Sequence, residues 1–539
     1  MVHTDVLVVG AGPVGLTAAV ELRRRGVDCR IVDRLPSRLP FAKAVGIQPR
    51  TLEIWDRMGL ARAALDAAVP MRGQLLYVNG TERMRIDLEL PPEVPYGFAV
   101  LPQYETERLL DDHLARWDTR IERGTELVSF EQDADGVTSR LTTSTGDEQE
   151  LRSRYLIGCD GAHSVVRRTL GLAFEGSAFP EEYMLGDVEV DWSLPPGYSV
   201  RSLHRSDGKT DDILVCIPLP GRSRYRMSMP VPPELSTQGQ RGGGEIAHGL
   251  EGGRAPGLAH IQAVLDRLSP QPTTASAMRW SSVFRISHRL VDRYADDRVF
   301  VAGDAAHIHP PTGAQGMNTG IQDAYNLAWK LTLALAGTAN PGLLDSYDAE
   351  RRPVGEEVVG RTVRHAVEGI QTDPEDPATL MMREAQLLVA YPDSPIVGPD
   401  SPVADGVRSG DRAPDCGGLV GDIATFPMRL YDLLRDRDHV LLLYADDEEA
   451  AAGFGELAAS ARQLAHGRMD ACAVLAADVP AGGDPGLPVV HDSRGEFRRG
   501  YHAQGSTAFL IRPDGYVGVR QSPAARPELA AHLAGVFRT

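Results

Sequence analysis

The order of apolar and polar positions predicts a strand, a helix and a second strand near the start of the chain. Residues 6–9 form a short run of Val and Leu, which is typical of a buried parallel strand. Apolar residues recur at helical spacing over residues 16–25, and Gly26 follows as a helix stop. Cys29–Asp33 is again mostly apolar and predicts the second strand. The pattern therefore indicates a βαβ unit.

Two kinds of pattern alternate along the chain up to about residue 390. Strand-like alternation with many Pro and Gly turns dominates residues 73–99 and 184–280 and predicts antiparallel strands at 213–218 and 225–230. The other parts have the pattern of an α/β domain. Its buried strands are predicted at 155–158 and 299–302, and its helices at 49–58, 107–114, 316–336 and 347–369. The chain is therefore expected to pass back and forth between two domains.

The last part is expected to form a further α/β unit behind a linker. Residues 391–414 are rich in Pro, Gly, Asp and Ser, which favours a linker. Strands are predicted at 440–444, 473–475, 508–511 and 516–519. The sequence Arg512-Pro513-Asp514-Gly515 is a strong turn that joins the last two strands into a hairpin before a short helix. The glycines at 242–244 and 252–253 predict an exposed loop.

Composition and charge remove several classes of function. The chain has 539 residues, enough for roughly two to four domains. Its net charge of −18 argues against nucleic acid or an anionic membrane as a partner, since both require a basic surface. No apolar run reaches the ~18 residues that span a bilayer, and no signal peptide is evident. The five scattered cysteines lack any CxxC spacing, so reduced thiols and a cytoplasmic location are expected.

A glycine motif lies between the first predicted strand and helix. Gly10-x-Gly12-x-x-Gly15 follows a strand, opens a helix, and is followed by Asp33 at the end of the next strand. In this context Gly10 permits a tight turn, Gly12 lets a pyrophosphate approach the backbone, and Gly15 lets the helix pack on the strand. The helix N-terminus offers N–H groups to the phosphates. Asp33 is placed to hydrogen-bond a ribose, so the motif predicts a bound dinucleotide.

Two later motifs follow predicted strands of the same domain. Asp160-Gly161 comes directly after the strand at 155–158. Gly303-Asp304-Ala305-Ala306-His307 follows the strand at 299–302, and Pro311 and Gly316-Met317-Asn318 lead into the long helix. Ligands of open α/β sheets bind at the carboxyl ends of the strands, so Asp304 is expected at the ligand. The N-terminus of that helix can then face a developing anion.

His307 and His309 also allow a metal site to be considered. They stand two residues apart, but no third ligand lies at a suitable spacing. Packing or contact with a cofactor is therefore the favoured interpretation, and no metal is expected.

The three motifs in this order resemble those of the class A flavoprotein aromatic hydroxylases, the p-hydroxybenzoate hydroxylase-like superfamily. The resemblance is strongest to its longer branch, which includes phenol hydroxylase, pentachlorophenol monooxygenase and the aromatic polyketide hydroxylases. Residues 409–415 and 510–515 resemble the thioredoxin-like domain appended in that branch. The resemblance covers nearly the whole chain.

The resemblance implies an α/β fold of three domains. A Rossmann-like FAD-binding domain would comprise residues 1–72, 100–180 and 281–390. A mainly antiparallel β-sheet domain for the substrate, interleaved with it, would comprise 73–99 and 181–280. A linker at 391–405 would lead to a thioredoxin-like C-terminal domain at 406–539. This last domain lacks CxxC and is not expected to act as a thiol oxidoreductase.

The resemblance also implies which residues contact FAD. The glycines of the first motif would hold the pyrophosphate, Asp33 the adenosine ribose, and Asp304 the ribityl chain. Backbone amides of the third motif would lie near the flavin's pyrimidine edge and stabilise negative charge there. The implied FAD-binding set is Gly10, Gly12, Gly15, Asp33, Arg34, Arg50, Gln103, Asp160, Gly161, Asp304, Pro311, Gly316, Met317 and Asn318. Gln315 stands where p-hydroxybenzoate hydroxylase has a lysine, so fixed charge must come from the helix N-terminus.

The implied activity is hydroxylation of a small phenolic or polyketide-type aromatic substrate. NADPH or NADH would reduce FAD transiently, and O₂ would then form a flavin C4a-hydroperoxide. The catalytic group is not identified, and the candidates are Arg50, Arg224 and Arg226. Either arginine of the strand at 225–230 could instead lie on a solvated face, and Arg50 on a helix surface. A homodimer is left open.

Three other functions compete with hydroxylation. A flavin-dependent halogenase would carry Trp-x-Trp-x-Ile-Pro, and none of the five Trp residues falls in such a segment. A Baeyer–Villiger or epoxidising oxygenase on the same scaffold stays open, as does a non-catalytic flavoprotein that docks a partner.

Overall fold

The computed structural model describes residues 2–40, 44–236, 255–368, 375–399, 406–421, 423, 426–480 and 486–538. Two eight-stranded sheets, a six-stranded sheet and a small three-stranded sheet carry the strands of these residues. The mixed α/β class predicted from the sequence is confirmed. The glycine-rich stretch at 242–253 lies outside the described residues.

The first large sheet contains the predicted βαβ unit. Its strands run in the order β17-β18-β11-β1-β2-β8, and neighbours from β18 to β8 are parallel. The bounds are β17 (Ala295–Asp296), β18 (Val299–Val301), β11 (Glu148–Gly158), β1 (Val2–Val9), β2 (Cys29–Asp33) and β8 (Ile121–Arg123). The hairpin β9 (Thr125–Asp133) and β10 (Gly136–Thr143) pairs with β11. This sheet is the Rossmann-like part of the molecule.

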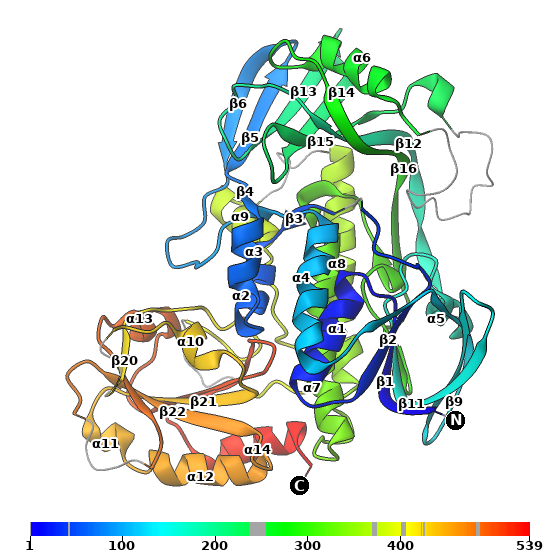
Figure 1. Ribbon diagram of the computed structural model, residues 1–539. Helices are drawn as coiled ribbons and strands as arrows, with labels where there is room; N and C mark the ends of the chain where they lie inside the picture. Colours follow the sequence, from blue (N-terminus) through cyan, green and yellow to red (C-terminus); the bar gives the residue numbers. More distant parts are fainter. Residues whose placement is uncertain are drawn as a thin grey trace.

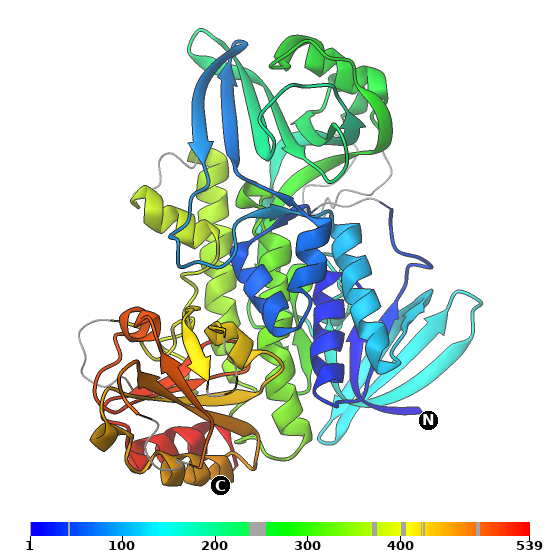
Figure 2. The ribbon, with the colours of Figure 1, turned by 60° about the vertical axis from the view of Figure 1, so that its left-hand side comes forward.

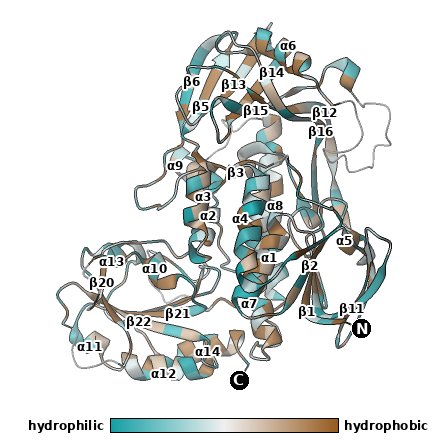
Figure 3. Ribbon diagram, in the orientation of Figure 1, coloured by the Kyte–Doolittle hydropathy of each residue, from teal (hydrophilic) through white to brown (hydrophobic). Residues whose placement is uncertain are grey.

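Long helices pack beside this sheet (Figures 1 and 2). They are α1 (Pro13–Arg24), α4 (Gln103–Leu114), α7 (Gly316–Leu335) and α8 (Ser346–Glu368), with the shorter α2 (Pro49–Arg57) and α3 (Ala61–Ala67). Helix α4 is largely hydrophilic in Figure 3, whereas almost all of α7 is buried. The apolar sides of the helices and the central strands form one core, which fixes the strand ends where a ligand would bind.

The second large sheet lies at one end of the molecule, under α6 (Leu258–Leu268) (Figure 1). Its order is β19-β16-β12-β15-β14-β13-β5-β6. The bounds are β5 (Gly73–Val78), β6 (Thr81–Asp87), β12 (Phe174–Glu189), β13 (Tyr198–Ser206), β14 (Lys209–Pro218), β15 (Arg224–Pro230), β16 (Ser276–Val291) and β19 (His307–Ile308). Strand β12 begins before the predicted limit 181, and β16 continues past the predicted limit 280. Both strands extend toward the first sheet (Figure 1).

A small sheet lies between the two large ones. It consists of β3 (Gly46–Ile47), β7 (Ala99–Val100) and β4 (Val69–Pro70). Val45 and Val100 pack there with Leu219 and Ile217 from the second large sheet and the loop that follows β14. The face of the second sheet opposite α6 is therefore turned toward the first sheet.

The C-terminal unit has a six-stranded sheet in the order β20-β23-β22-β21-β24-β25. The bounds are β20 (Leu419–Gly421), β21 (His439–Ala445), β22 (Met469–Ala476), β23 (Val489–Asp492), β24 (Thr507–Ile511) and β25 (Val517–Gln521). Its helices are α10 (Leu430–Leu434), α11 (Glu448–Ala451), α12 (Phe454–Leu464), α13 (Glu496–Tyr501) and α14 (Arg526–Val536). The predicted hairpin and final helix are confirmed. A thioredoxin-like class for this unit stays a prediction.

The segment predicted as a linker is packed against the rest of the protein where it is described. Tyr391 is buried, and its hydroxyl accepts a hydrogen bond from Arg351 at 2.9 Å. Ile396 belongs to the C-terminal core. The described residues 391–399 therefore form a packed connection, because turn-rich composition does not reveal such long-range partners. The linker bounds 391–405 stay a prediction. Among the described residues, no helix has both the length and the hydropathy to cross a membrane.

His439 predicts an acid-sensitive step in stability. It is buried between Trp329 and Phe537, and neither ring nitrogen has a hydrogen-bond partner among the described residues. Burial lowers the pKa of His439 to about 3. The unfolded chain therefore takes up this proton first, and stability is lost as the pH falls from about 6.5 toward 3, by about 1.4 kcal/mol per pH unit.

Urea unfolding between pH 7 and pH 4 checks this expectation. His439→Leu should flatten the slope by about 1.4 kcal/mol per pH unit, because the leucine cannot take up a proton. Replacing exposed His3 by Leu serves as the control and should leave the slope unchanged. Equal slopes for wild type and His439→Leu would contradict the assignment.

Candidate functional site

The first motif forms a tight turn between β1 and α1. Gly10 has φ +100°, and a Cβ there would lie 2.3 Å from the carbonyl oxygen of Cys159. This close approach requires glycine and brings the first and second motifs together. Gly12 is the N-cap of α1, makes no side-chain cap, and has no atom within 4 Å of a Cβ position. The turn therefore leaves open space and uncapped N–H groups at the helix N-terminus.

Asp33 lies at the end of β2 beside this turn. Its carboxylate accepts hydrogen bonds from the backbone N–H of Ala11 at 2.7 Å and of Leu35 at 2.8 Å. Arg123 is 3.7 Å away. The carboxylate is thereby fixed at the glycine turn with lone pairs left to accept a hydroxyl. Arg34 is exposed next to it.

Gln103, the first residue of α4, donates a hydrogen bond to Glu107 at 2.9 Å, and its backbone N–H donates to Ala44 at 3.0 Å. Glu107 is buried, and burial raises the pKa of its carboxyl group, with Asp33 contributing in the same direction. Gln103 and Asp33 thus act on the same buried carboxyl group and belong to one polar region.

The second motif places a carboxylate under a short helix. One oxygen of Asp160 accepts hydrogen bonds from the N–H groups of Val165 and Val166 in α5 (Val165–Thr169) at 2.6 and 3.3 Å. The other oxygen, Oδ1, is buried and has no hydrogen-bond partner among the residues that the structure describes. Burial raises the pKa of Asp160 above its usual value. Gly161 beside it has open space at its Cβ position. An unpartnered buried oxygen next to open backbone is suited to a ligand donor.

The third motif is held in place by Asp323 of α7. Asp304 lies half-buried in a short 3₁₀ turn, η3 (Gly303–Ala305), after β18. Asp323 accepts hydrogen bonds from the N–H of Gly303 at 3.1 Å and from Arg351 at 2.8 Å, and lies 2.8 Å from His307. A Cβ on Gly303 would meet Val14 of α1 at 2.8 Å. Asp323 was not among the site residues predicted from the sequence. The feature that could have pointed to it is a carboxylate within an otherwise apolar helix.

The first turn of α7 follows this motif. Gln315, the residue before Gly316, makes no side-chain cap, so its side chain leaves the first-turn N–H groups of α7 uncapped. Gly316 and Met317 are half-buried, and Pro311 is exposed. The side chain of Asn318 is fully used locally, since its Oδ1 accepts from Gln48 and Thr51 and its Nδ2 donates to Gly46 and Ala314.

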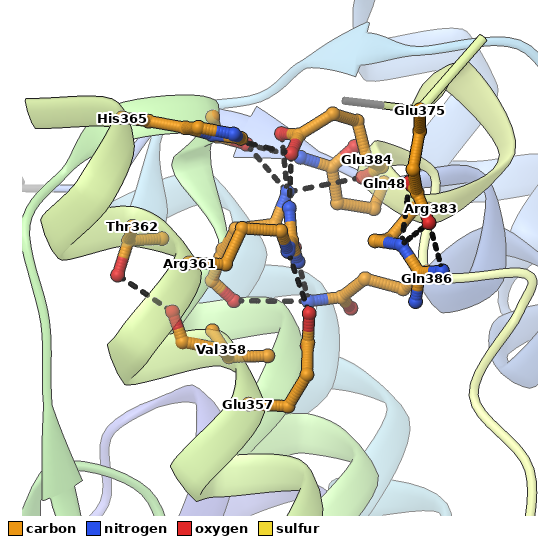
Figure 4. A network of polar contacts seen from close by, with 12 residues as sticks. Gln48, Glu357, Val358, Arg361, Thr362, His365, Glu375, Arg383, Glu384 and Gln386 are labelled. Atoms are coloured by element: carbon orange, nitrogen blue, oxygen red, sulfur yellow. Dashed lines mark hydrogen bonds and ion pairs between the residues drawn. The ribbon is translucent and has the colours of Figure 1, made fainter. Parts of the chain in front are cut away.

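Gln315 is drawn away from the helix N-terminus into a network of α8 and α9 (Pro377–Glu384). Its amide donates to Glu384 Oε2 at 3.0 Å and accepts from Gln386 at 2.7 Å. Figure 4 shows Glu384 facing Arg361 and His365, with Gln386 nearby. Gln315 therefore has a positioning role, and the α7 N-terminus carries the local positive potential.

Arg50 does not contact this site. The side chain is buried and points toward the C-terminal unit. It donates hydrogen bonds to Glu53 at 2.9 Å and to the carbonyl of Asp514 at 2.7 Å. It also lies over the ring of Tyr516. Its partners are Glu53 on its own helix and residues of the C-terminal unit, so the guanidinium makes no contact within the glycine turn or the later motifs. That Arg50 binds the cofactor or acts in catalysis stays a prediction. The alternative of a helix-surface arginine is wrong.

Arg224 and Arg226 lie on β15, on the face of the second sheet opposite α6. Arg226 is buried and forms a bidentate pair with Asp187 at 2.6 and 2.8 Å. Arg224 donates to the carbonyl of Pro220 at 2.8 Å and to Tyr104 of α4 at 3.4 Å. The solvated-face alternative does not describe Arg226, whose charge is already balanced. Arg224 links the second sheet to α4.

His307 and His309 stack with ring centroids 6.0 Å apart. His309 Nε2 and His307 Nδ1 are buried without hydrogen-bond partners among the described residues. Burial lowers the pKa of His309 to about 4. Within the described part of the chain, no group of three His, Cys, Asp or Glu side chains is arranged to hold a metal ion.

The three motifs thus form one polar cradle at the carboxyl ends of β1, β2, β11 and β18. It comprises Gly10, Gly12, Asp33, Asp160, Asp304 and the first turn of α7. This is the class of site that Rossmann-like sheets build for a dinucleotide, with two uncapped helix N-termini, an open glycine and an unpartnered buried oxygen to receive it.

Comparison with known proteins identifies the dinucleotide. The family model described as FAD binding domain matches residues 3–362. The chain is 33% identical over 553 residues to 6-methylpretetramide 4-monooxygenase of Streptomyces rimosus, covering 98% of this chain and 93% of that protein. It is 32% identical over 543 residues to pentachlorophenol 4-monooxygenase of Sphingobium chlorophenolicum, covering 96% and 93%.

A solved structure shares the whole architecture. The flavin-dependent monooxygenase PieE in complex with FAD and substrate superposes with a TM-score of 0.81 at 25% identity, covering 99% of each chain. The chain therefore belongs to the FAD-binding domain family, among the class A flavin-dependent monooxygenases. Its cofactor is FAD, and the resemblance seen in the sequence motifs is confirmed.

Proposed function

We propose that the protein hydroxylates a phenolic or polyketide-type aromatic substrate, using O₂ and NADPH or NADH. The observation that carries this proposal is the position of the cradle. The first turn of α7 and Asp304 lie at the strand ends of the first sheet, and the second sheet turns its α6-free face toward them. A cofactor and a flat organic substrate can thus meet between two sheets.

The residues of the cradle fit FAD. Gly10 and Gly12 with the N-terminus of α1 would hold the pyrophosphate, and Asp33, with Arg34 beside it, the adenosine ribose. Asp160, Gly161, Gln103 and Asp304 would contact the middle of the cofactor, and Pro311 would border it. When bound, FAD supplies the redox chemistry that activates O₂.

The protein's own groups would act in three ways. The N–H groups of Gly316, Met317 and Asn318 would stabilise negative charge at the pyrimidine edge of the cofactor. Asp323 would hold the turn that carries Asp304, because it fixes the Gly303 N–H. The half-buried face of the second sheet would exclude water from the reacting atoms.

The domain layout supports this division of labour. We assign residues 1–72, 100–180 and 281–390 to FAD binding, with the substrate sheet between them, and residues 406–539 to a capping unit. The nicotinamide cofactor would bind transiently, since a single glycine motif of the dinucleotide type is present in the sequence. We further propose that the protein is cytoplasmic. Light scattering would show whether it forms a homodimer.

Purification tests the proposal directly. The protein should be yellow with the absorbance of bound FAD, and phenols or polycyclic quinones should stimulate NAD(P)H consumption. The product should gain one oxygen atom as a phenol, and its connectivity separates hydroxylation from ester or epoxide formation. A protein that binds FAD but shows no stimulated consumption with any aromatic compound would refute the enzymatic proposal. A non-catalytic flavoprotein behaves in that way.

A further inference from the structure

The second sheet has one face filled by the protein and one face that is not. Leu75, Val200, Cys216 and Met227 point to the α6 side and form a closed apolar core with Ile261. Side chains alternate between faces along a strand, so their neighbours point to the opposite side. That opposite face is the one turned toward the first sheet, as Ile217 shows by packing against Val45 and Val100.

The strand register places one row of residues across this opposite face. Successive partners in the row are Leu76, Arg201, Val215, Ser228, Leu185 and Ser282. Every member is half-buried. Tyr183 and Phe284 lie two positions further along their strands, with ring centroids 5.8 Å apart. The row is thus apolar or weakly polar except for a single cation, Arg201.

Arg201 differs from the other arginines of this face. Arg226 is paired with Asp187, and Arg224 donates to Pro220 and Tyr104. Within the described residues, Arg201 makes no hydrogen bond and no ion pair. Burial lowers the pKa of Arg201, and Tyr183 is the one group that opposes this shift. The protein therefore keeps a partly desolvated guanidinium without a counter-ion, an arrangement that costs stability.

We propose, on the basis of the function proposed above, that Arg201 binds an acidic oxygen group of the aromatic substrate. The guanidinium presents a planar pair of N–H donors that matches the two oxygens of a carboxylate or of an ionised hydroxy-ketone. Leu185, Val215 and the Tyr183–Phe284 pair offer an apolar surface for the rings. The substrate class is therefore an aromatic acid or acidic polyketide rather than a neutral phenol, and Arg201 is its specificity-determining residue.

The test uses the FAD-loaded enzyme and a matched pair of probes, 1-hydroxy-2-naphthoate and its methyl ester. Equilibrium dialysis gives the affinity of each probe without relying on turnover. Wild type should bind the acid at least tenfold more tightly than the ester. Arg201→Met should weaken acid binding about 10- to 100-fold, the range of a hydrogen bond to a charged group, and leave the ester unchanged.

Arg205→Met is the matched control, because Arg205 lies on the same strand, is exposed, and loses the same charge. It should keep the preference for the acid. A wild type without this preference, or an Arg201→Met variant that retains it, would overturn the proposal. Comparing the 1-hydroxy-2-naphthoate with 1-naphthol separates a carboxylate from a phenol oxygen as the bound group. FAD content and ester-stimulated NAD(P)H consumption report on the general function separately, so the two proposals fail in different measurements.

Thermal unfolding of the ligand-free holoenzyme gives a second readout. A guanidinium kept for a ligand should not stabilise the empty protein, so Arg201→Met should leave Tm unchanged or raise it. Arg226→Met should lower Tm, because it strands Asp187 without its partner. A loss of Tm in Arg201→Met equal to that of Arg226→Met would assign Arg201 a structural role and overturn the proposal.

Discussion

Glu350→Gln is expected to lower the free energy of unfolding by about 3–5 kcal/mol. Glu350 is fully buried in α8, where Arg512 donates to both of its oxygens at 2.6 and 2.8 Å and Lys330 lies at 2.7 Å. Asn326 and Ser394 donate two further hydrogen bonds. The neutral amide would leave the two cations facing only Asp514.

The expected cost follows from where the partners lie. Arg512 and Asp514 come from the turn between β24 and β25, while Lys330 comes from α7, so this network joins the C-terminal unit to the FAD-binding helices. Burial alone would raise the pKa of Glu350, but Arg512 and Lys330 hold it well below its usual value. Burial lowers the pKa of Lys330 to about 8, although Glu350 opposes the shift. The ionised state of each group thus depends on the other.

Urea unfolding at pH 7 measures the effect. Glu356→Gln is the control, because Glu356 lies on the same helix, is exposed, and makes only a 3.5 Å pair with Arg352. That change should cost less than about 1 kcal/mol. The double variant Glu350→Gln with Lys330→Met should recover part of the loss, since it removes one stranded cation. A Glu350→Gln protein as stable as the control would show that the network contributes little.

The local parts of the fold were predictable from the sequence. The βαβ unit, the long helix α7 and the terminal hairpin depend on periodicity and on Gly and Pro at turns, which act over a few residues. The cradle was predictable for the same reason. Gly10, Gly12 and Asp33 mark strand ends, and parallel strands bring their carboxyl ends to one edge.

The features that the sequence did not reveal are contacts between residues far apart in the chain. Arg50 and Asp514 are separated by 464 positions, and nothing near Arg50 signals that partner. The stretch from Tyr391 has a turn-rich composition, yet it is packed because Arg351 and Glu350 bind it. Arg226 resembles an anion-binding arginine in the sequence, but Asp187 on the adjacent strand β12 is its register partner and neutralises it. Charge balance of a buried arginine is a tertiary property.

Gly12→Val is expected to weaken FAD binding about 10- to 100-fold while leaving the fold intact. Gly12 has φ −76°, which any residue adopts, and no protein atom lies within 4 Å of its Cβ position. The Cβ of a valine there meets no protein atom within 4 Å, and the side chain enters the space that the pyrophosphate would need at the N-terminus of α1. Gly15 offers the contrast, since a Cβ there would lie 1.9 Å from the carbonyl oxygen of Gly10.

Flavin titration of the apoprotein and urea unfolding separate the two effects. Gly12→Val should lose affinity for FAD at unchanged apoprotein stability, whereas Gly15→Ala should lose stability as well, because the turn must open. Gly535→Val, at an exposed helical glycine of the C-terminal unit with equally open space, should change neither quantity. Full FAD affinity in Gly12→Val would mean that the cofactor's phosphates lie elsewhere. In that case the pyrophosphate would not contact the N-terminus of α1, because the open space at Gly12 is its route to the helix N–H groups.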